Sequence, residues 1–180
     1  MLARGLKFVR DHLDIAMDPV RYARRIGVTV GEGCRLIGID RMTFGSEPYL
    51  VSLGNVVGVT AGVRFVTHDG SVGLFRHKYP GMEVLGRIVV HDRVFIGMGT
   101  LLLPGVEIGP DVVLAAGSVV SRTIPPGTVA AGTPARPIRS MDDHESALLR
   151  RAVFVKDSPP AERRRVHLES TARASAARRG

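Results

Sequence analysis

The chain has 180 residues, enough for one domain with a sizeable core, and 44% of them are hydrophobic. Trp is absent and aromatic residues make up only 5%, so the core must be built from aliphatic side chains. The formal charge of +8 admits an anionic partner, but Lys and Arg gather toward the two ends, which favours solvated basic ends. The single cysteine excludes an intrachain disulfide. No apolar run resembles an export signal or a membrane span, so we expect a cytoplasmic protein without stable membrane insertion.

Two helices are predicted within residues 1–25. The first covers residues 2–16, where apolar residues recur at helical spacing at Leu2, Leu6, Val9 and Leu13. Asp18 followed by Pro19 is typical of an N-cap and the first turn of a second helix, which ends at Arg25.

The next segment begins a six-residue pattern and then loses it. The first hexad opens at Val30 and has Cys34 in its fifth place, so we expect this thiol to point inward. The pattern slips between residues 40 and 48, resumes at Leu53, and breaks again over residues 71–87. A repeat array tolerates such an insertion only as an external loop, and loops of this length are commonly functional.

His68 stands just before that loop, in the fourth place of the hexad that Phe65 opens. We expect the first and fifth places to point into the solenoid, so the imidazole of His68 should project outward at the base of the loop. A neutral imidazole can accept a proton near pH 7, which makes His68 a candidate general base. Position alone favours an ordinary surface histidine.

The hexads then run without interruption, and an aliphatic residue opens each of them: Val90, Ile96, Leu102, Ile108, Leu114 and Val120. A period of six fits neither a helix nor a simple strand. It fits a solenoid of short parallel strands, in which each hexad forms one flat face and then turns a corner. The sequence therefore predicts a mainly β solenoid over residues 26–140, with a final short strand and turn over residues 129–138.

The remaining residues divide into a cap and a tail. We predict a helix over residues 141–156 that caps the exposed strand edges at the end of the array. Residues 157–180 are basic and offer little to bury, so we expect disorder there.

Several stretches resemble the left-handed parallel β-helix of hexapeptide-repeat acyltransferases, in particular sugar O-acetyltransferases found with surface-polysaccharide genes. Those within the hexads and after them are Phe95-Ile-Gly-Met-Gly, Leu103-Pro-Gly-Val-Glu-Ile-Gly, Ala116-Gly-Ser-Val-Val, Ile124-Pro-Pro-Gly and Ala130-Ala-Gly-Thr-Pro-Ala-Arg-Pro-Ile. Earlier ones are Phe44-Gly-Ser-Glu-Pro-Tyr and Gly62-Val-Arg-Phe-Val-Thr-His68-Asp-Gly. The resemblance covers residues 23–140.

The resemblance implies a homotrimer that transfers an acetyl group from acetyl-CoA to a hydroxyl of a sugar or sugar-containing precursor, with active sites between subunits. It implies that His68 is the catalytic base and that transfer is direct, without an acyl-enzyme. Glu47 and Asp69 are candidates for orienting His68 or binding the acceptor. Asp69 is its chain neighbour, but neighbours on a strand point to opposite faces. Glu47 lies in a stretch that carries the resemblance.

The same resemblance implies positions for acetyl-CoA, and it implies no metal. Residues that would line the pantetheine arm are Met98, Ala116 and Ser121. Basic residues that would meet the nucleotide phosphates are Arg122, Arg136 and Arg139. Phe95 stands where several relatives have Trp, which leaves the shape of the acyl pocket open. The identity of the acceptor, O- as against N-acylation and the length of the acyl chain are open as well.

Two other classes remain. A zinc lyase resembling γ-class carbonic anhydrases would use His68, His77 and His91, but the His-x4-His pair that this class requires is missing. A non-catalytic scaffold or nucleic-acid binder would use the basic tail, but the stacking aromatic residues expected for single-strand binding are missing.

Overall fold

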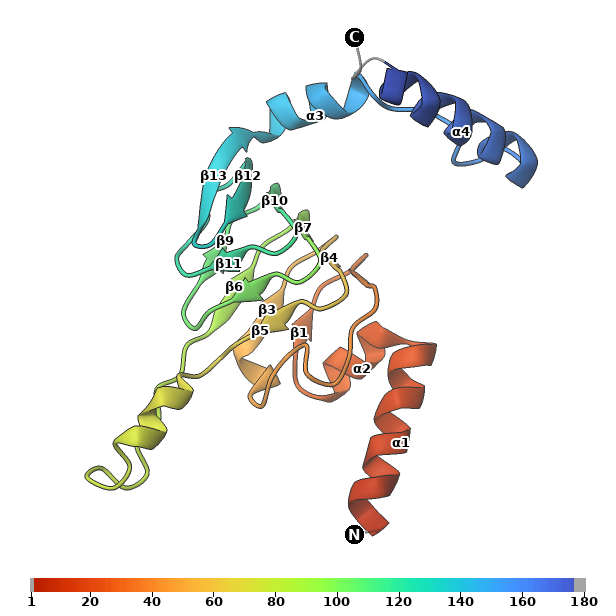
Figure 1. Ribbon diagram of the computed structural model, residues 1–180. Coiled ribbons are helices and arrows are strands. Elements are labelled where there is room, and N and C mark those ends of the chain that lie inside the picture. Colours follow the sequence, from red (N-terminus) through yellow and green to blue (C-terminus); the bar gives the residue numbers. More distant parts are fainter. Residues whose placement is uncertain (1, 177–180) are drawn as a thin grey trace. The chain divides into compact units, whose positions relative to one another are not determined.

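The computed structural model describes residues 2–176 (Figure 1). The chain divides into two compact units, with the boundary between Asp142 and Asp143. Unit 1 holds two N-terminal helices, α1 (Leu2–Met17) and α2 (Pro19–Arg25), followed by all thirteen strands that are described. Both helices match their predicted ranges, and the Asp18 carboxylate accepts a hydrogen bond from the backbone N–H of Arg21 at 2.9 Å, as expected for an N-cap.

The strands of unit 1 form three sheets. The first sheet contains β1 (Thr29–Val30), β3 (Val51–Leu53), β6 (Ile88–Val90) and β9 (Glu107–Ile108). The second contains β2 (Arg35–Leu36), β4 (Gly58–Val59), β7 (Val94–Ile96), β10 (Val112–Leu114), β12 (Thr128–Gly132) and β13 (Ala135–Ser140). The third contains β5 (Arg64–Phe65), β8 (Leu101–Leu102) and β11 (Val119–Val120).

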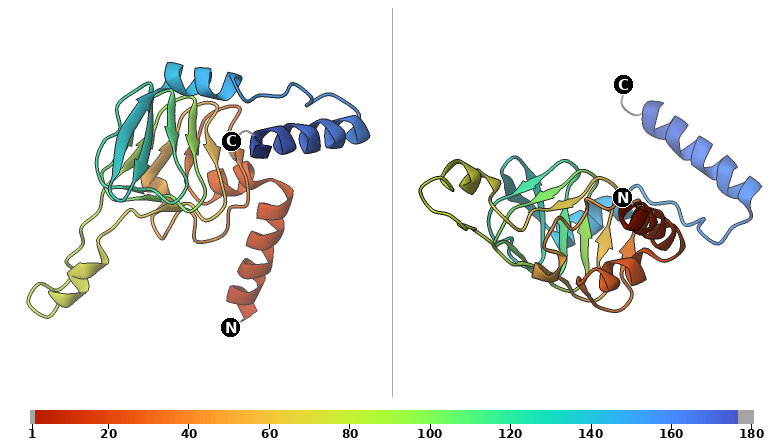
Figure 2. Two further views of the ribbon diagram at one scale, coloured as in Figure 1. Left: turned by 45° about the horizontal axis from the view of Figure 1, so that its top comes forward. Right: turned by 90° about the horizontal axis from the view of Figure 1, so that it is seen from below.

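The chain visits these sheets in turn and so winds into a three-sided coil (Figures 1 and 2). All strand pairs are parallel except β12 with β13. Val90 pairs with Ile108, and Ile96 pairs with Leu114, so one coil takes three hexads. The predicted parallel solenoid is confirmed.

The core is a stack of aliphatic side chains from the first and fifth places of the hexads. Ile96, Ile108 and Leu114 are completely buried, and so are the fifth-place residues Val112 and Thr100. The buried Thr100 hydroxyl donates to the carbonyl of Gly97 at 2.7 Å, which satisfies its hydrogen-bonding need. Cys34 departs from the rule, because it is only partly buried at the edge of the core.

The corners of the coil place the fourth residue of a hexad in a left-handed backbone conformation. Glycine occupies most of these corners, but Val56 adopts φ 57° and its side chain is 58% exposed. A β-branched residue is strained there, because its Cβ crowds the following carbonyl oxygen.

We therefore expect Val56→Asn to raise the free energy of unfolding by about 1 kcal/mol, since asparagine tolerates this region. Chemical denaturation of the variant and the wild type checks this. The matched control is Val153→Asn, at a 41% exposed valine without positive φ. A gain at both positions would show that polarity, not backbone strain, is responsible.

The C-terminal part differs from the sequence-based predictions in three ways. The last strand and turn are a hairpin, in which β13 runs antiparallel to β12 and forms the end of the second sheet. The predicted cap over residues 141–156 is wrong in extent, because helix α3 covers only Met141–Leu149. None of its residues is buried, so the edge of β12 is covered by β13 and the helix adds no buried cap.

The prediction of disorder over residues 157–180 is wrong for residues 160–176, which form helix α4 (Pro160–Ala176) in unit 2. This segment has proline in its first position and is rich in Ala, Arg and Glu, which favour a helix without burying anything. Arg165 and Glu169 form an ion pair across one turn at 3.0 Å. The rest of the predicted tail beyond residue 176 lies outside the described residues.

Candidate active site

The two interruptions of the hexad pattern meet beside strand β5. The backbone N–H of Phe65 donates to the carbonyl of Thr43 at 2.8 Å, so the 40–48 segment lies against this strand. Phe44 and Phe65 are both buried and stack with their ring centroids 5.1 Å apart. This packing brings Glu47 to the base of the loop that follows His68.

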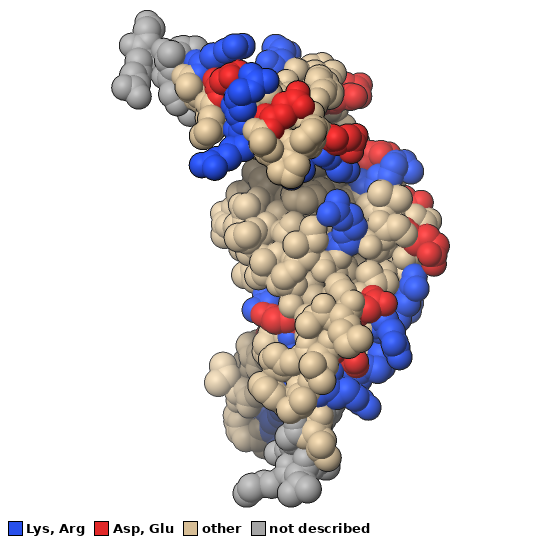
Figure 3. All heavy atoms as spheres, turned by 90° about the vertical axis from the view of Figure 1, so that its right-hand side faces the viewer, with Lys and Arg blue, Asp and Glu red and all other residues tan. Residues whose placement is uncertain are grey.

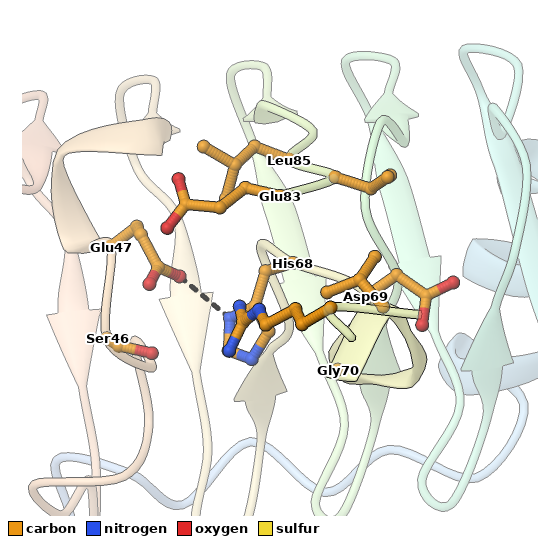
Figure 4. A pocket seen from close by; sticks show the side chains of 10 residues that line it. Ser46, Glu47, His68, Asp69, Gly70, Glu83 and Leu85 are labelled. Carbon is orange, nitrogen blue, oxygen red and sulfur yellow. Dashed lines mark hydrogen bonds and ion pairs between the residues drawn. The ribbon is translucent and has the colours of Figure 1, made fainter. Parts of the chain in front are cut away.

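Glu47 and His68 form a hydrogen-bonded pair (Figure 4). The distance from His68 Nδ1 to Glu47 Oε2 is 2.8 Å, and the Thr67 hydroxyl donates to the same oxygen at 2.7 Å. Because an ionised carboxylate only accepts, Nδ1 of a neutral imidazole must carry the proton, and Nε2 then keeps its lone pair. The His68 side chain is 43% exposed, as its predicted outward position requires.

The environment of Glu47 keeps its carboxylate ionised. The hydrogen bond from Thr67 is the largest influence and lowers the pKa of Glu47, against the effect of partial burial. The hydrogen bond from His68 acts in the same direction. Thr67 itself is buried, so the hydroxyl that donates to Glu47 Oε2 has a fixed position.

Asp69 caps a short helix instead of pairing with the imidazole of His68. Its carboxylate accepts from the backbone N–H of Ser71 at 2.9 Å and caps the 3-10 helix η2 (Gly70–Leu74). The hydrogen bonds from Ser71 lower the pKa of Asp69. In Figure 4 its side chain is directed away from the imidazole. Of the two predicted partners, the structure brings Glu47 to His68 and places Asp69 at the start of the loop.

The loop is an arm with a paired neck. His68 and Leu85 form an antiparallel bridge, and the N–H of Gly86 donates to the carbonyl of Thr67 at 2.8 Å. Beyond this neck the arm projects away from the coils (Figures 1 and 2). The paired neck fixes the backbone of His68 although the hexad pattern ends there.

His68 borders two cavities of different character. One, of about 240 Å³, contains most of the polar side chains, which come from the 40–48 segment and the arm and lie beside Val72, Val84 and Leu85: Ser46, Glu47, Asp69, Arg76 and Glu83. The other, of about 390 Å³, is mainly apolar, with Met42, Phe65, Val66 and Leu101 in its wall. The imidazole can therefore contact a polar molecule on one side and an apolar chain on the other.

The seven candidate cofactor residues do not gather in one place. Met98 and Ala116 are exposed at the corner between the second and third sheets, and the N–H of Gly117 donates to the carbonyl of Met98 at 2.8 Å, so their coils are adjacent. Ser121 and Arg122 are exposed at the corner where the third sheet ends, as is His68 on an earlier coil. The remaining three lie on the second sheet: Phe95 on β7, and Arg136 and Arg139 on β13.

Four polar residues of the site were not singled out from the sequence: Ser46, Thr67, Arg76 and Glu83. One feature of the sequence pointed to Thr67. It stands in the third place of its hexad, just after a strand that ends in a buried aromatic residue. Arg76 and Glu83 lie in the arm, where no period indicates which way a side chain points.

Two of the histidines considered for a zinc site have contacts of their own. His77 contacts the carbonyl of Leu74 at 3.0 Å, and His91 pairs with Glu107 at 2.6 Å. Among residues 2–176, no group of three His, Cys, Asp or Glu side chains is arranged to hold a metal ion. On the face shown in Figure 3, Lys and Arg alternate with Asp and Glu instead of forming one basic field. None of the described helices is long and apolar enough to cross a bilayer.

The three-sided coil of hexads is the fold of hexapeptide-repeat transferases. Residues 87–122 match the bacterial transferase hexapeptide family, which has six repeats. Protein CapG of Staphylococcus aureus is 47% identical over 133 residues, which cover 74% of this chain and 77% of CapG. The chain therefore belongs to the hexapeptide-repeat acyltransferase family, and it is an acyltransferase.

Two further proteins are similar over different shares of the chain. The 2,3,4,5-tetrahydropyridine-2,6-dicarboxylate N-acetyltransferase of Clostridium perfringens is 49% identical over 55 residues, which cover 31% of this chain and 23% of that enzyme. The crystal structure of the hexapeptide-repeat acetyltransferase VCA0836 of Vibrio cholerae superposes with a TM-score of 0.51 at 23% identity. It covers 75% of this chain and 89% of that one, and it shows the shared fold.

Proposed function

We propose that this acyltransferase moves an acetyl group from acetyl-CoA to a hydroxyl of a sugar or sugar-containing precursor. The observation that carries the proposal is the Glu47–His68 pair between a polar cavity and an apolar one. A polyhydroxyl acceptor fits the polar cavity, where carboxylates and Arg76 offer hydrogen-bond partners. The apolar cavity fits the thioester end of the donor.

In the proposed reaction His68 is the general base. Nε2 takes the proton of the acceptor hydroxyl while that oxygen attacks the thioester carbonyl, and Glu47 stabilises the imidazolium that forms. Backbone N–H groups stabilise the oxyanion of the tetrahedral intermediate. As the C–S bond breaks, the imidazolium returns the proton to the departing thiolate. No acyl-enzyme forms, so the products are the acetylated acceptor and free CoA.

The donor would extend from His68 along the coil toward its C-terminal end. Met98 and Ala116 lie at one corner on adjacent coils, which supports a role in lining the pantetheine arm. Arg122, Arg136 and Arg139 are exposed beyond them and would meet the phosphates of CoA. We propose the left-handed coil and the homotrimer of this family as well. An exposed Phe95 (48%) and Met98 (61%) agree with a groove that a second subunit completes.

The test is a screen for CoA release from acetyl-CoA with free sugars, nucleotide sugars and glycolipid precursors as acceptors. We expect release that depends on a hydroxylated sugar and yields an ester. Amino sugars belong in the screen, because one similar protein is named an N-acetyltransferase. An amide product would show that the acceptor is an amine and not a hydroxyl. CoA release that is equally fast without any sugar would refute the proposal.

A further inference from the structure

A second polar cavity, of about 500 Å³, lies between the N-terminal helices and the 40–48 segment. Three arginines line it: Arg10 from α1, Arg25 from α2, and Arg41 from the segment. Tyr22 and Tyr49 contribute to its wall as well. We call it the arginine cavity. No step of the proposed reaction uses it.

The charges of the arginine cavity do not cancel. Asp11 is the one acidic residue in its described wall, and its carboxylate lies 2.7 Å from Arg25 and 3.4 Å from Arg41. Arg25 also pairs with Asp14 at 2.8 Å. The Asp11 side chain is buried, with 4% exposed, so these pairs hold α1 in place. Arg10 is exposed, and no ion pair of its guanidinium occurs within the part of the chain that the structure describes.

The arginine cavity adjoins both cavities of His68. Ser46 forms part of the wall of all three, and its chain neighbour Glu47 is the residue that contacts His68. An acceptor placed with a hydroxyl at His68 therefore has Ser46 between it and the arginine cavity.

The arginine cavity lies on the opposite side of His68 from the residues proposed for the donor. Helix α2 packs against β1 and β2, the strands with which the coil begins. His68 follows β5, at the outer end of the third sheet nearest that beginning, whereas Arg122 follows β11 at the other end. Arg136 and Arg139 lie on β13, the last strand of the second sheet.

We propose that the arginine cavity binds a phosphate group of the acceptor, so that the acceptor is a sugar phosphate or a sugar diphosphate. Guanidinium groups recognise phosphate through charge-assisted hydrogen bonds, and Arg10 is free to make them. The phosphates of CoA offer the same chemistry, but the residues proposed to bind them lie toward the C-terminal end of the coil, on the other side of His68. The choice of acceptor rests on the proposed function, whereas binding of phosphate by this cavity does not.

The experiment is calorimetric titration of the full chain with pyrophosphate, with and without saturating CoA. Saturating CoA fills the phosphate site proposed for the donor, and we expect pyrophosphate still to bind under that condition. Arg10→Gln should weaken this binding about tenfold without changing the affinity for CoA. Arg10 is the better target because Arg25 and Arg41 both pair with the buried Asp11, so removing either would take away part of the charge that compensates this carboxylate. Arg21→Gln is the matched control, since Arg21 is an exposed arginine of α2 outside the cavity wall.

Three results would overturn the proposal: no binding of pyrophosphate, equal weakening by Arg10→Gln and Arg21→Gln, or loss of pyrophosphate binding when CoA is present. The last would assign the cavity to the donor, and Arg10→Gln would then weaken CoA. Because binding is measured without turnover, its failure is separate from a failure of the acyl-transfer proposal. If that proposal holds, Arg10→Gln should also raise the KM for a sugar 1-phosphate about tenfold and leave the KM for the unphosphorylated sugar unchanged.

Discussion

Replacement of His68 by alanine should lower kcat for acetyl transfer by about 100- to 10,000-fold, the range for loss of a general base. His68 borders both cavities, and its Nδ1 is held by Glu47, which leaves Nε2 to act as the base. The side chain is 43% exposed and contributes no core packing, so the variant should fold and bind CoA normally. Initial rates of CoA release, together with the CoA affinity of each protein, measure both expectations.

His91 provides the matched control for this experiment. His91 also pairs with a glutamate, since its Nε2 lies 2.6 Å from Glu107 Oε1, but this pair is on the first sheet and borders neither cavity of His68. His91→Ala should turn over like the wild type. Near-wild-type turnover of His68→Ala would remove His68 from the mechanism, and an equal loss in both variants would point to damage of the coil.

The hexads could be recognised from the sequence because each of them satisfies the same local rule. From Val90 to Ile124, every first and fifth place is buried, and this regularity is visible without knowledge of any long-range contact. The rule says nothing about the ends of the coil. Helix α4 was missed because its Ala, Arg and Glu residues stabilise a helix through local propensity, whereas the small number of large apolar residues suggested disorder.

The site was only partly predictable, and the reason is geometric. His68 could be placed at the base of the arm from its hexad position. Periodicity gave no information on its partner, because Glu47 lies 21 residues away and is brought to the imidazole by the stacking of Phe44 on Phe65. Glu47 was a candidate only through the resemblance of its stretch to the family. Asp69 was a candidate because it is next to His68 in the chain, but its carboxylate caps η2 instead. The sites of functional interest are the interruptions of the repeat, where periodic reasoning gives no side-chain direction.

Replacement of Glu47 by glutamine should lower kcat by about 10- to 100-fold, the value of one charge-assisted hydrogen bond, and leave the KM for acetyl-CoA unchanged. Glutamine keeps the size of the side chain but removes the charge that stabilises the imidazolium. Glu47 acts through His68 as a positioning residue, so Glu47→Gln should lower kcat less than His68→Ala does. The double variant His68→Ala/Glu47→Gln should be no slower than His68→Ala alone, because the carboxylate acts through the imidazole.

The pH dependence of stability gives a second readout for the same carboxylate. Since the pKa of Glu47 is lowered in the folded protein, its ionised form stabilises the fold fully above the ordinary value of 4.5, and this contribution is lost as pH falls through the folded pKa. The difference in unfolding free energy between wild type and Glu47→Gln should therefore shrink on acidification below pH 4.5. Glu107→Gln is the matched control, because its carboxylate also contacts a histidine but is 54% exposed and has no threonine donor among its described contacts. A loss of activity in Glu107→Gln as large as in Glu47→Gln would show that the charge of the coil, and not the contact with His68, governs the rate.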